Sequence, residues 1–165
     1  MAGIQPSASQ WLAMAKERRE QGDPRAAIMA YCAALEHGAP PAGVELQLGV
    51  LHAQLGERDR AEAHLRQAIK HAPRDADAHC MLGIVLHELA RFDEAARALD
   101  QALAIAPDSP DAHFNLGLTR FERGDVSGAA ASFARCAALK RGEPWNEARR
   151  ADLSRQPAPR FGQRR

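Results

Sequence analysis

Seven histidines are the first candidates for metal chemistry in this sequence. His64 and His71 are seven residues apart, and His79 and His87 are eight apart, so each pair could share one face of a helix. The His-x3-His spacing, which places two ligands on successive turns, does not occur. His79 and His113 are 34 residues apart and occupy equivalent places in a repeated pattern, as packing residues do. The sequence therefore predicts structural or solvent-exposed histidines and no metal ion.

No catalytic motif accompanies these residues. The sequence contains no glycine-rich phosphate-binding loop, no GxSxG and no HExxH. Asp93 and Glu94 fall at a predicted helix start, where the helix dipole favours negative charge. Cys32, Cys80 and Cys136 form no CxxC pair, so we expect small buried residues. The chain is predicted to be no enzyme and to use no cofactor or small-molecule substrate.

Composition and charge favour a cytoplasmic helical protein with a basic C-terminal tail. Hydrophobic residues make up 45% of the 165 residues and aromatics only 5%, which favours close helix packing over β-layers. No apolar run is long enough to span a bilayer, and the first twenty residues show no secretory signal. The net charge is +1, but residues 140–165 hold eight basic and three acidic side chains. A solvated tail explains this excess, and we do not expect it to bind nucleic acid or membrane.

The elements that position these residues repeat every 34 positions. A Leu-Gly pair, a later alanine and a large apolar residue each recur three times at this spacing. These residues are Leu48-Gly49, Leu82-Gly83 and Leu116-Gly117; Ala61, Ala95 and Ala129; and Leu65, Leu99 and Phe133. Related residues stand one period earlier, so the periods are 8–41, 42–75, 76–109 and 110–143. Each period holds two amphipathic stretches, at about its positions 2–14 and 17–30, which predict two helices.

This pattern resembles the tetratricopeptide repeat. The resemblance implies an all-α solenoid of four helix-turn-helix repeats, stacked into a short right-handed superhelix. Residues 1–7 form a leader in this interpretation. Residues 144–154 are expected to form a short capping helix and residues 155–165 a disordered basic tail.

Local signals mark the ends of these helices. Ser7 begins a capping box with Gln10, and the pairs Asp23-Pro24 and Ser109-Pro110 are typical helix starts. The turns between paired helices hold Gly22, Gly56 and Gly124, whose left-handed conformation closes a helix. Ala90 takes that place in the third period, so we expect its turn to be looser or differently built. Gly49, Gly83 and Gly117 are expected to allow close approach of the second helix at Ala61, Ala95 and Ala129.

In the family that this chain resembles, positions 2, 5, 9, 12 and 13 of each repeat line a concave groove that contacts partners. We call the residues at these positions the inner face. The candidate binding residues carried over from the resemblance are Leu12, Lys16, Arg19, Leu46, Val50, Cys80, Ile84, His87, Phe114, Leu118 and Phe121. A clamp for acidic chain ends needs basic residues along the groove, whereas only Lys16 and Arg19 are basic here. The remainder is mostly apolar. Its large apolar residues are expected to be surplus to the core, namely Leu46, Val50, Ile84, Phe114, Leu118 and Phe121.

The sequence therefore predicts a protein-interaction adaptor or assembly factor that binds a peptide or helix in an apolar groove. Coverage of this groove by the chain's own tail, or by a second copy, is an alternative because large exposed apolar patches are uncommon. A secretion-type chaperone for an apolar cargo segment is the closest rival. The rival from another class is an accessory module for a transferase or hydroxylase on another chain. The residues do not identify the partner.

Overall fold

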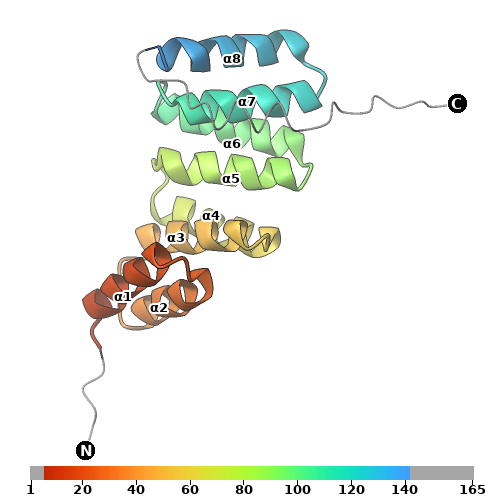
Figure 1. Cartoon of the computed structure of the whole chain (residues 1–165). Coiled ribbons are helices and arrows are strands. Elements are labelled where there is room, and N and C mark those ends of the chain that lie inside the picture. Colours follow the sequence, from red (N-terminus) through yellow and green to blue (C-terminus); the bar gives the residue numbers. More distant parts are fainter. Residues whose placement is uncertain (1–5, 142–165) are drawn as a thin grey trace, which may run out of the picture.

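The computed structural model describes residues 6–141, which form eight α-helices. The helices are α1 (Ala8–Glu20), α2 (Pro24–Glu36), α3 (Pro41–Gln54), α4 (Arg58–His71), α5 (Ala76–Glu88), α6 (Phe92–Ile105), α7 (Pro110–Glu122) and α8 (Val126–Leu139). Consecutive helices pair as hairpins, and the hairpins stack along one direction (Figure 1). The prediction of an all-α solenoid of four helix-turn-helix units is confirmed.

The three predicted helix caps, at Ser7, Asp23 and Ser109, are present, and Asp125 provides one that was not predicted. The Ser7 hydroxyl accepts from the backbone N–H of Gln10, and the Gln10 side chain accepts from the backbone N–H of Ser7 at 2.7 Å. Asp23 and Ser109 cap α2 and α7, each directly before a proline. Asp125 caps α8, and the backbone N–H of Gly128 holds the pKa of the Asp125 carboxyl below its usual range. These caps satisfy backbone donors that a helix start leaves without partners.

The turn at Ala90 corrects the sequence-based expectation. Ala90 adopts a positive φ of 58°, close to the 75° of Gly56. Its N–H donates to the His87 carbonyl at 2.9 Å, and the Arg91 N–H donates to the Leu86 carbonyl at 2.9 Å. The same pattern of two bonds closes the glycine turns, so the turn is neither looser nor differently built. Left-handed alanine costs about 1–2 kcal/mol, which the helix pair must offset.

The recurring glycines let the paired helices approach closely, although their nearest neighbours are not the alanines. A Cβ atom added at Gly83 would lie 2.5 Å from Leu99 Cγ, whereas the Ala95 carbonyl oxygen would be 3.2 Å away. At Gly117 the three nearest atoms all belong to Phe133. The glycine therefore makes room chiefly for a large apolar side chain of the second helix. Leu99 uses this room to become completely buried.

Two histidines join consecutive repeats. The Nε2–H group of His79 donates to the Pro73 carbonyl at 3.0 Å, and that of His113 donates to the Pro107 carbonyl at 2.9 Å. A carbonyl oxygen only accepts, so each ring nitrogen must carry the proton. The structural role predicted for this pair is confirmed. Among the described residues, no three His, Cys, Asp or Glu side chains are grouped as metal ligands.

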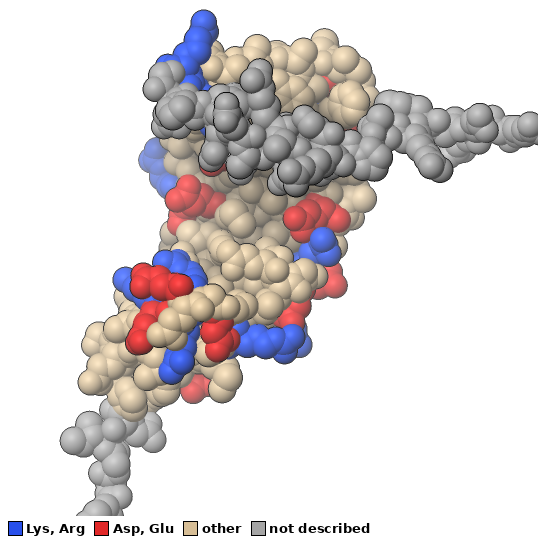
Figure 2. Space-filling model, in the orientation of Figure 1, with Lys and Arg blue, Asp and Glu red and all other residues tan. Residues whose placement is uncertain are grey.

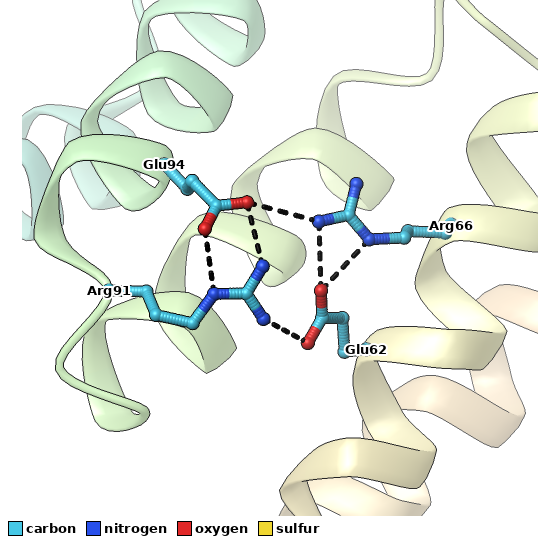
Figure 3. Close-up of polar contacts among 4 residues, drawn as sticks. All are labelled: Glu62, Arg66, Arg91 and Glu94. Carbon is cyan, nitrogen blue, oxygen red and sulfur yellow. Dashed lines mark hydrogen bonds and ion pairs between the residues drawn. The ribbon is translucent and has the colours of Figure 1, made fainter.

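A closed ring of charges connects α4 to α6 (Figure 3). Arg91 binds both oxygens of Glu94 at 2.7 Å and reaches Glu62 at 2.6 Å. Arg66 contacts Glu62 at 2.8 Å and Glu94 at 3.4 Å. The hydrogen bonds from Arg91 hold the pKa of Glu94 below its usual range. Each cation meets two carboxylates, so the ring ties neighbouring repeats together on the side of their second helices.

Several sequence-based predictions concern the ends of the chain and the cysteines. Residues 1–5 and 142–165 lie outside the described part, and with them most of the leader, the capping helix of 144–154 and the tail of 155–165. The expectation of buried cysteines is wrong for Cys32, which is exposed, while Cys80 is half-buried and Cys136 buried. None of the described helices is both long and apolar enough to cross a membrane.

Candidate partner-binding surface

The inner face is carried by the first helix of each pair. Helices α3, α5 and α7 lie side by side, since α5 contacts both others (Figure 1). The Arg19 guanidinium of α1 donates to the side-chain carbonyl of Gln47 on α3 and joins the first repeat to this face. Lys16, Arg19 and Phe121 are exposed, and the other eight candidate residues are half-buried. No candidate is completely buried, so side-chain surface of all eleven reaches the solvent.

The row at the fifth position of each repeat is part of the packing. Leu12 packs against the core of the first repeats, and Leu46 packs against the core that contains Leu82. Cys80 contacts the core around Leu99. The Phe114 ring lies 5.7 Å from the Phe133 ring, tilted by 57°. The expectation that large inner-face residues are surplus to the core is therefore wrong for Leu46 and Phe114.

A second row, at the ninth position of each repeat, is less involved in packing than the row at the fifth position. Val50, Ile84 and Leu118 are half-buried and are not among the residues packed against the described cores. Phe121 follows Leu118 on the same face of α7 and keeps 42% of its surface exposed. These four residues form what we call the apolar stripe. An apolar stripe on parallel helices can hold the side chains of an extended or helical peptide.

Polar contacts orient His87 beside this stripe. The buried Thr119 hydroxyl donates to the Asn115 carbonyl at 2.8 Å, so it accepts at 3.1 Å from Nδ1–H of His87. The His87 ring also meets the Phe92 ring edge-on, with 5.3 Å between centroids. These contacts hold the imidazole in one orientation between α5 and α7.

Cys80, the only thiol among the candidate binding residues, is expected to be unreactive. Burial raises the pKa of Cys80 to about 11, and the neighbouring Asp111 and Asp77 add to the shift. At neutral pH the group is therefore protonated, and the thiolate is the form that acts as a nucleophile. Cys80 fits a packing role better than a reactive one.

Charges lie at the margins of the inner face. Figure 2 shows an uncharged area across the middle of this view, with acidic side chains on either side of it. Asp77 stands in the first turn of α5 and Glu88 is its last residue. The Glu88 carboxylate pairs with Arg58 at 2.8 Å, so part of this acidic margin is neutralised.

Sequence reasoning missed a second surface on the other side of α5. A hollow of about 410 Å³ lies between α4, α5 and α6. Its apolar part includes Leu86 and Ala98, and its margin includes Lys70 and Arg97. A comparison of residues 34 positions apart could have indicated it, because the residues equivalent to Leu86 are His52 and Arg120.

Solved structures with the same architecture are similar to this chain. MamA is 23% identical with a TM-score of 0.75, over 88% of this chain and 81% of that one. YrrB, described as "a TPR protein with an unusual peptide-binding site", is 18% identical with a TM-score of 0.74, over 82% and 70%. PilF of Pseudomonas aeruginosa is 23% identical with a TM-score of 0.73, over 83% and 63%. These likenesses show a shared fold.

The sequence matches no protein among those with curated functions. The profile of the tetratricopeptide repeat family matches residues 46–110 and again residues 80–144. The two matches overlap at residues 80–110 and together cover more than half of the chain. With the hairpins and the 34-residue period, they show that the chain belongs to the tetratricopeptide repeat family.

Proposed function

We propose that this chain is a non-enzymatic adaptor that binds a peptide or a helix of a partner protein along its inner face. The observation that carries the proposal is the apolar stripe of Val50, Ile84, Leu118 and Phe121. These side chains stand at repeated places on packed helices and keep surface in solvent. Their arrangement supports binding because rigid anchors lose little conformational freedom when a partner docks.

Similarity to repeat proteins supports an interaction role in general terms. YrrB is described as having a peptide-binding site, and it shares the solenoid architecture of this chain. The acidic margin at Asp77 and Glu122 favours a partner whose apolar anchors are flanked by basic or neutral residues.

The stripe can be tested by partner capture with a matched control. The variant Leu118→Gln with Phe121→Ser removes two anchors, whereas Met29→Ser with Val126→Ser removes apolar surface elsewhere. Met29 and Val126 are 74% and 63% exposed on α2 and α8. Aromatic anchors commonly contribute about 2 kcal/mol or more, so the stripe variant should capture a partner at least about tenfold less well.

Quantitative proteomics of the proteins retained from the source cell measures this loss. Circular dichroism and melting curves must show that both variants remain folded. Equal capture by the wild type and the stripe variant would contradict the proposal. The nature of the captured protein also separates the rival functions: an exported cargo indicates a secretion-type chaperone, and a transferase or hydroxylase indicates an accessory module.

A further inference from the structure

The hollow lies between α4, α5 and α6, where the second repeat meets the third, and two equivalent junctions between repeats can be compared with it. At each junction, the second helix of one repeat packs against the first helix of the next, and that first helix packs against its own second helix. At the middle junction Leu86 and Ala98 lie in the hollow, which has a volume of about 410 Å³. Both side chains are almost completely buried, with 1% and 8% of their surface exposed.

At the other two junctions, different side chains of the chain stand at the positions equivalent to Leu86 and Ala98. One period earlier, Leu86 and Ala98 correspond to His52 and His64, whose rings stack with 5.1 Å between centroids. Glu57 and Glu45 each bind one of these rings at 2.7 Å.

One period later, Leu86 and Ala98 correspond to Arg120 and Ser132. The Arg120 guanidinium donates to the Ser132 hydroxyl at 3.0 Å and to the Gly128 carbonyl at 3.4 Å. Larger or polar groups therefore take up the space at both outer junctions. Of the three junctions in the described residues, only the middle one combines a leucine with an alanine, and a hollow lies there.

The margin of the hollow is basic. Arg66 and Glu94 also line it, but the charge ring already pairs them (Figure 3). Lys70 and Arg97 are exposed and form no hydrogen bond or ion pair within residues 6–141. Neither cation is repeated at the equivalent positions of the neighbouring repeats. The residues equivalent to Lys70 are Glu36 and Ala104. Those equivalent to Arg97 are Ala63 and Ala131. Lys70 and Arg97 thus add positive charge to the hollow without a hydrogen bond or ion pair in the described residues, although Arg97 also helps to lower the pKa of Glu94.

We propose that this hollow binds an acidic peptide segment of a partner protein. One aliphatic side chain of the segment lies over Leu86 and Ala98, and neighbouring carboxylates pair with Lys70 and Arg97. The volume is at the lower end of the range for binding pockets, which suits one anchor rather than a large ligand. The charge ring holds α4 and α6 at a set separation, so the walls are in place before the peptide arrives.

This site is separate from the inner face. On α5 the hollow uses His79, Leu82 and Leu86, whereas the inner face uses other residues of the same helix. Binding at one surface can therefore be tested while the other is left unchanged.

The experiment measures the anisotropy of a fluorescein-labelled hexapeptide, Glu-Asp-Leu-Leu-Asp-Glu, titrated with the full chain at low salt. The variant Lys70→Glu with Arg97→Glu reverses the margin, and Ala98→Met takes up the hollow. Each should weaken binding by about tenfold or more. The control variant Arg25→Glu with Arg141→Glu makes the same charge change at exposed residues outside the hollow. It should leave affinity within about twofold, and a peptide with serines in place of the leucines should bind poorly.

Four outcomes would overturn the proposal. The first is no binding by the wild type up to about 1 mM. The second is equal weakening by the control variant, and the third is equal binding of the serine peptide, because each indicates diffuse charge attraction. The fourth is binding that Phe121→Ser abolishes and Ala98→Met leaves unchanged, which would place the peptide on the inner face. Melting curves show whether Ala98→Met folds. If this variant does not fold, the variant Lys70→Glu with Arg97→Glu, which changes only exposed side chains, still tests the proposal.

Discussion

Replacement of Ala90 by glycine should stabilise the protein, against the usual direction of a change to glycine. Ala90 has a φ of 58° in the turn after α5, and a left-handed alanine costs about 1–2 kcal/mol. Glycine removes that strain, but it gives the unfolded chain more freedom, which costs about 0.4–1 kcal/mol. The difference is a gain of about 0.5–1 kcal/mol in the free energy of unfolding.

Gly56 supplies the reverse experiment. It occupies the same turn one repeat earlier with a φ of 75°, and no atom lies within 4 Å of the place where a Cβ would be added. The variant Gly56→Ala therefore tests backbone strain without a steric clash. Its free energy of unfolding should fall by about as much as that of Ala90→Gly rises.

Urea unfolding followed by circular dichroism gives both free energies, provided that the slope with denaturant is unchanged. Destabilisation by Ala90→Gly would refute the reasoning. It would mean that the turn carries no strain, or that the alanine side chain makes a compensating contact.

Three further outcomes follow from single contacts. Gly83→Ala should destabilise the protein by about 1 kcal/mol in urea melts, since a Cβ 2.5 Å from the buried Leu99 outweighs a better helix propensity; stabilisation would contradict the close approach. Asp125→Ala should lower the melting temperature at neutral pH. Because the folded pKa of Asp125 lies below its unfolded value, this difference should persist above about pH 4 and vanish as the pH falls through the folded pKa. Cys80 should react with iodoacetamide far more slowly than exposed Cys32 at pH 8, and its rate should rise until about pH 11; equal rates, measured by mass spectrometry, would contradict its burial.

The helices were predictable because their signals are local. The capping box of Ser7 and the cap at Asp23 are readable from a few neighbouring letters, and the structure places both at helix starts. The 34-residue period then indicated which helices pair. The turn at Ala90 escaped because a preference for glycine is an average, and packing of the two helices overrides it at a single site.

The surfaces were harder to predict because they depend on contacts between repeats. A repeat pattern aligns equivalent positions, but it does not show that the Phe114 ring packs against the Phe133 ring, or that Cys32 is exposed. The open hollow depends on which residue replaces Leu86 in each repeat, and its volume follows only from the helix positions. Such features come from the differences among repeats, whereas the fold comes from what the repeats share.

The charge ring is one of several ion-pair sets that are distributed unevenly over the junctions between repeats. Between the second and third repeats, Arg58–Glu88 and two contacts of the ring resist bending. Between the third and fourth repeats, Arg123–Asp93 and Arg120–Asp100 do the same. Within residues 6–141, no ion pair spans the junction between the first and second repeats, where the Arg19 side chain donates a hydrogen bond to Gln47 instead. Thermal bending should therefore concentrate at that junction at low ionic strength. Added salt screens the other junctions and spreads the bending more evenly along the solenoid.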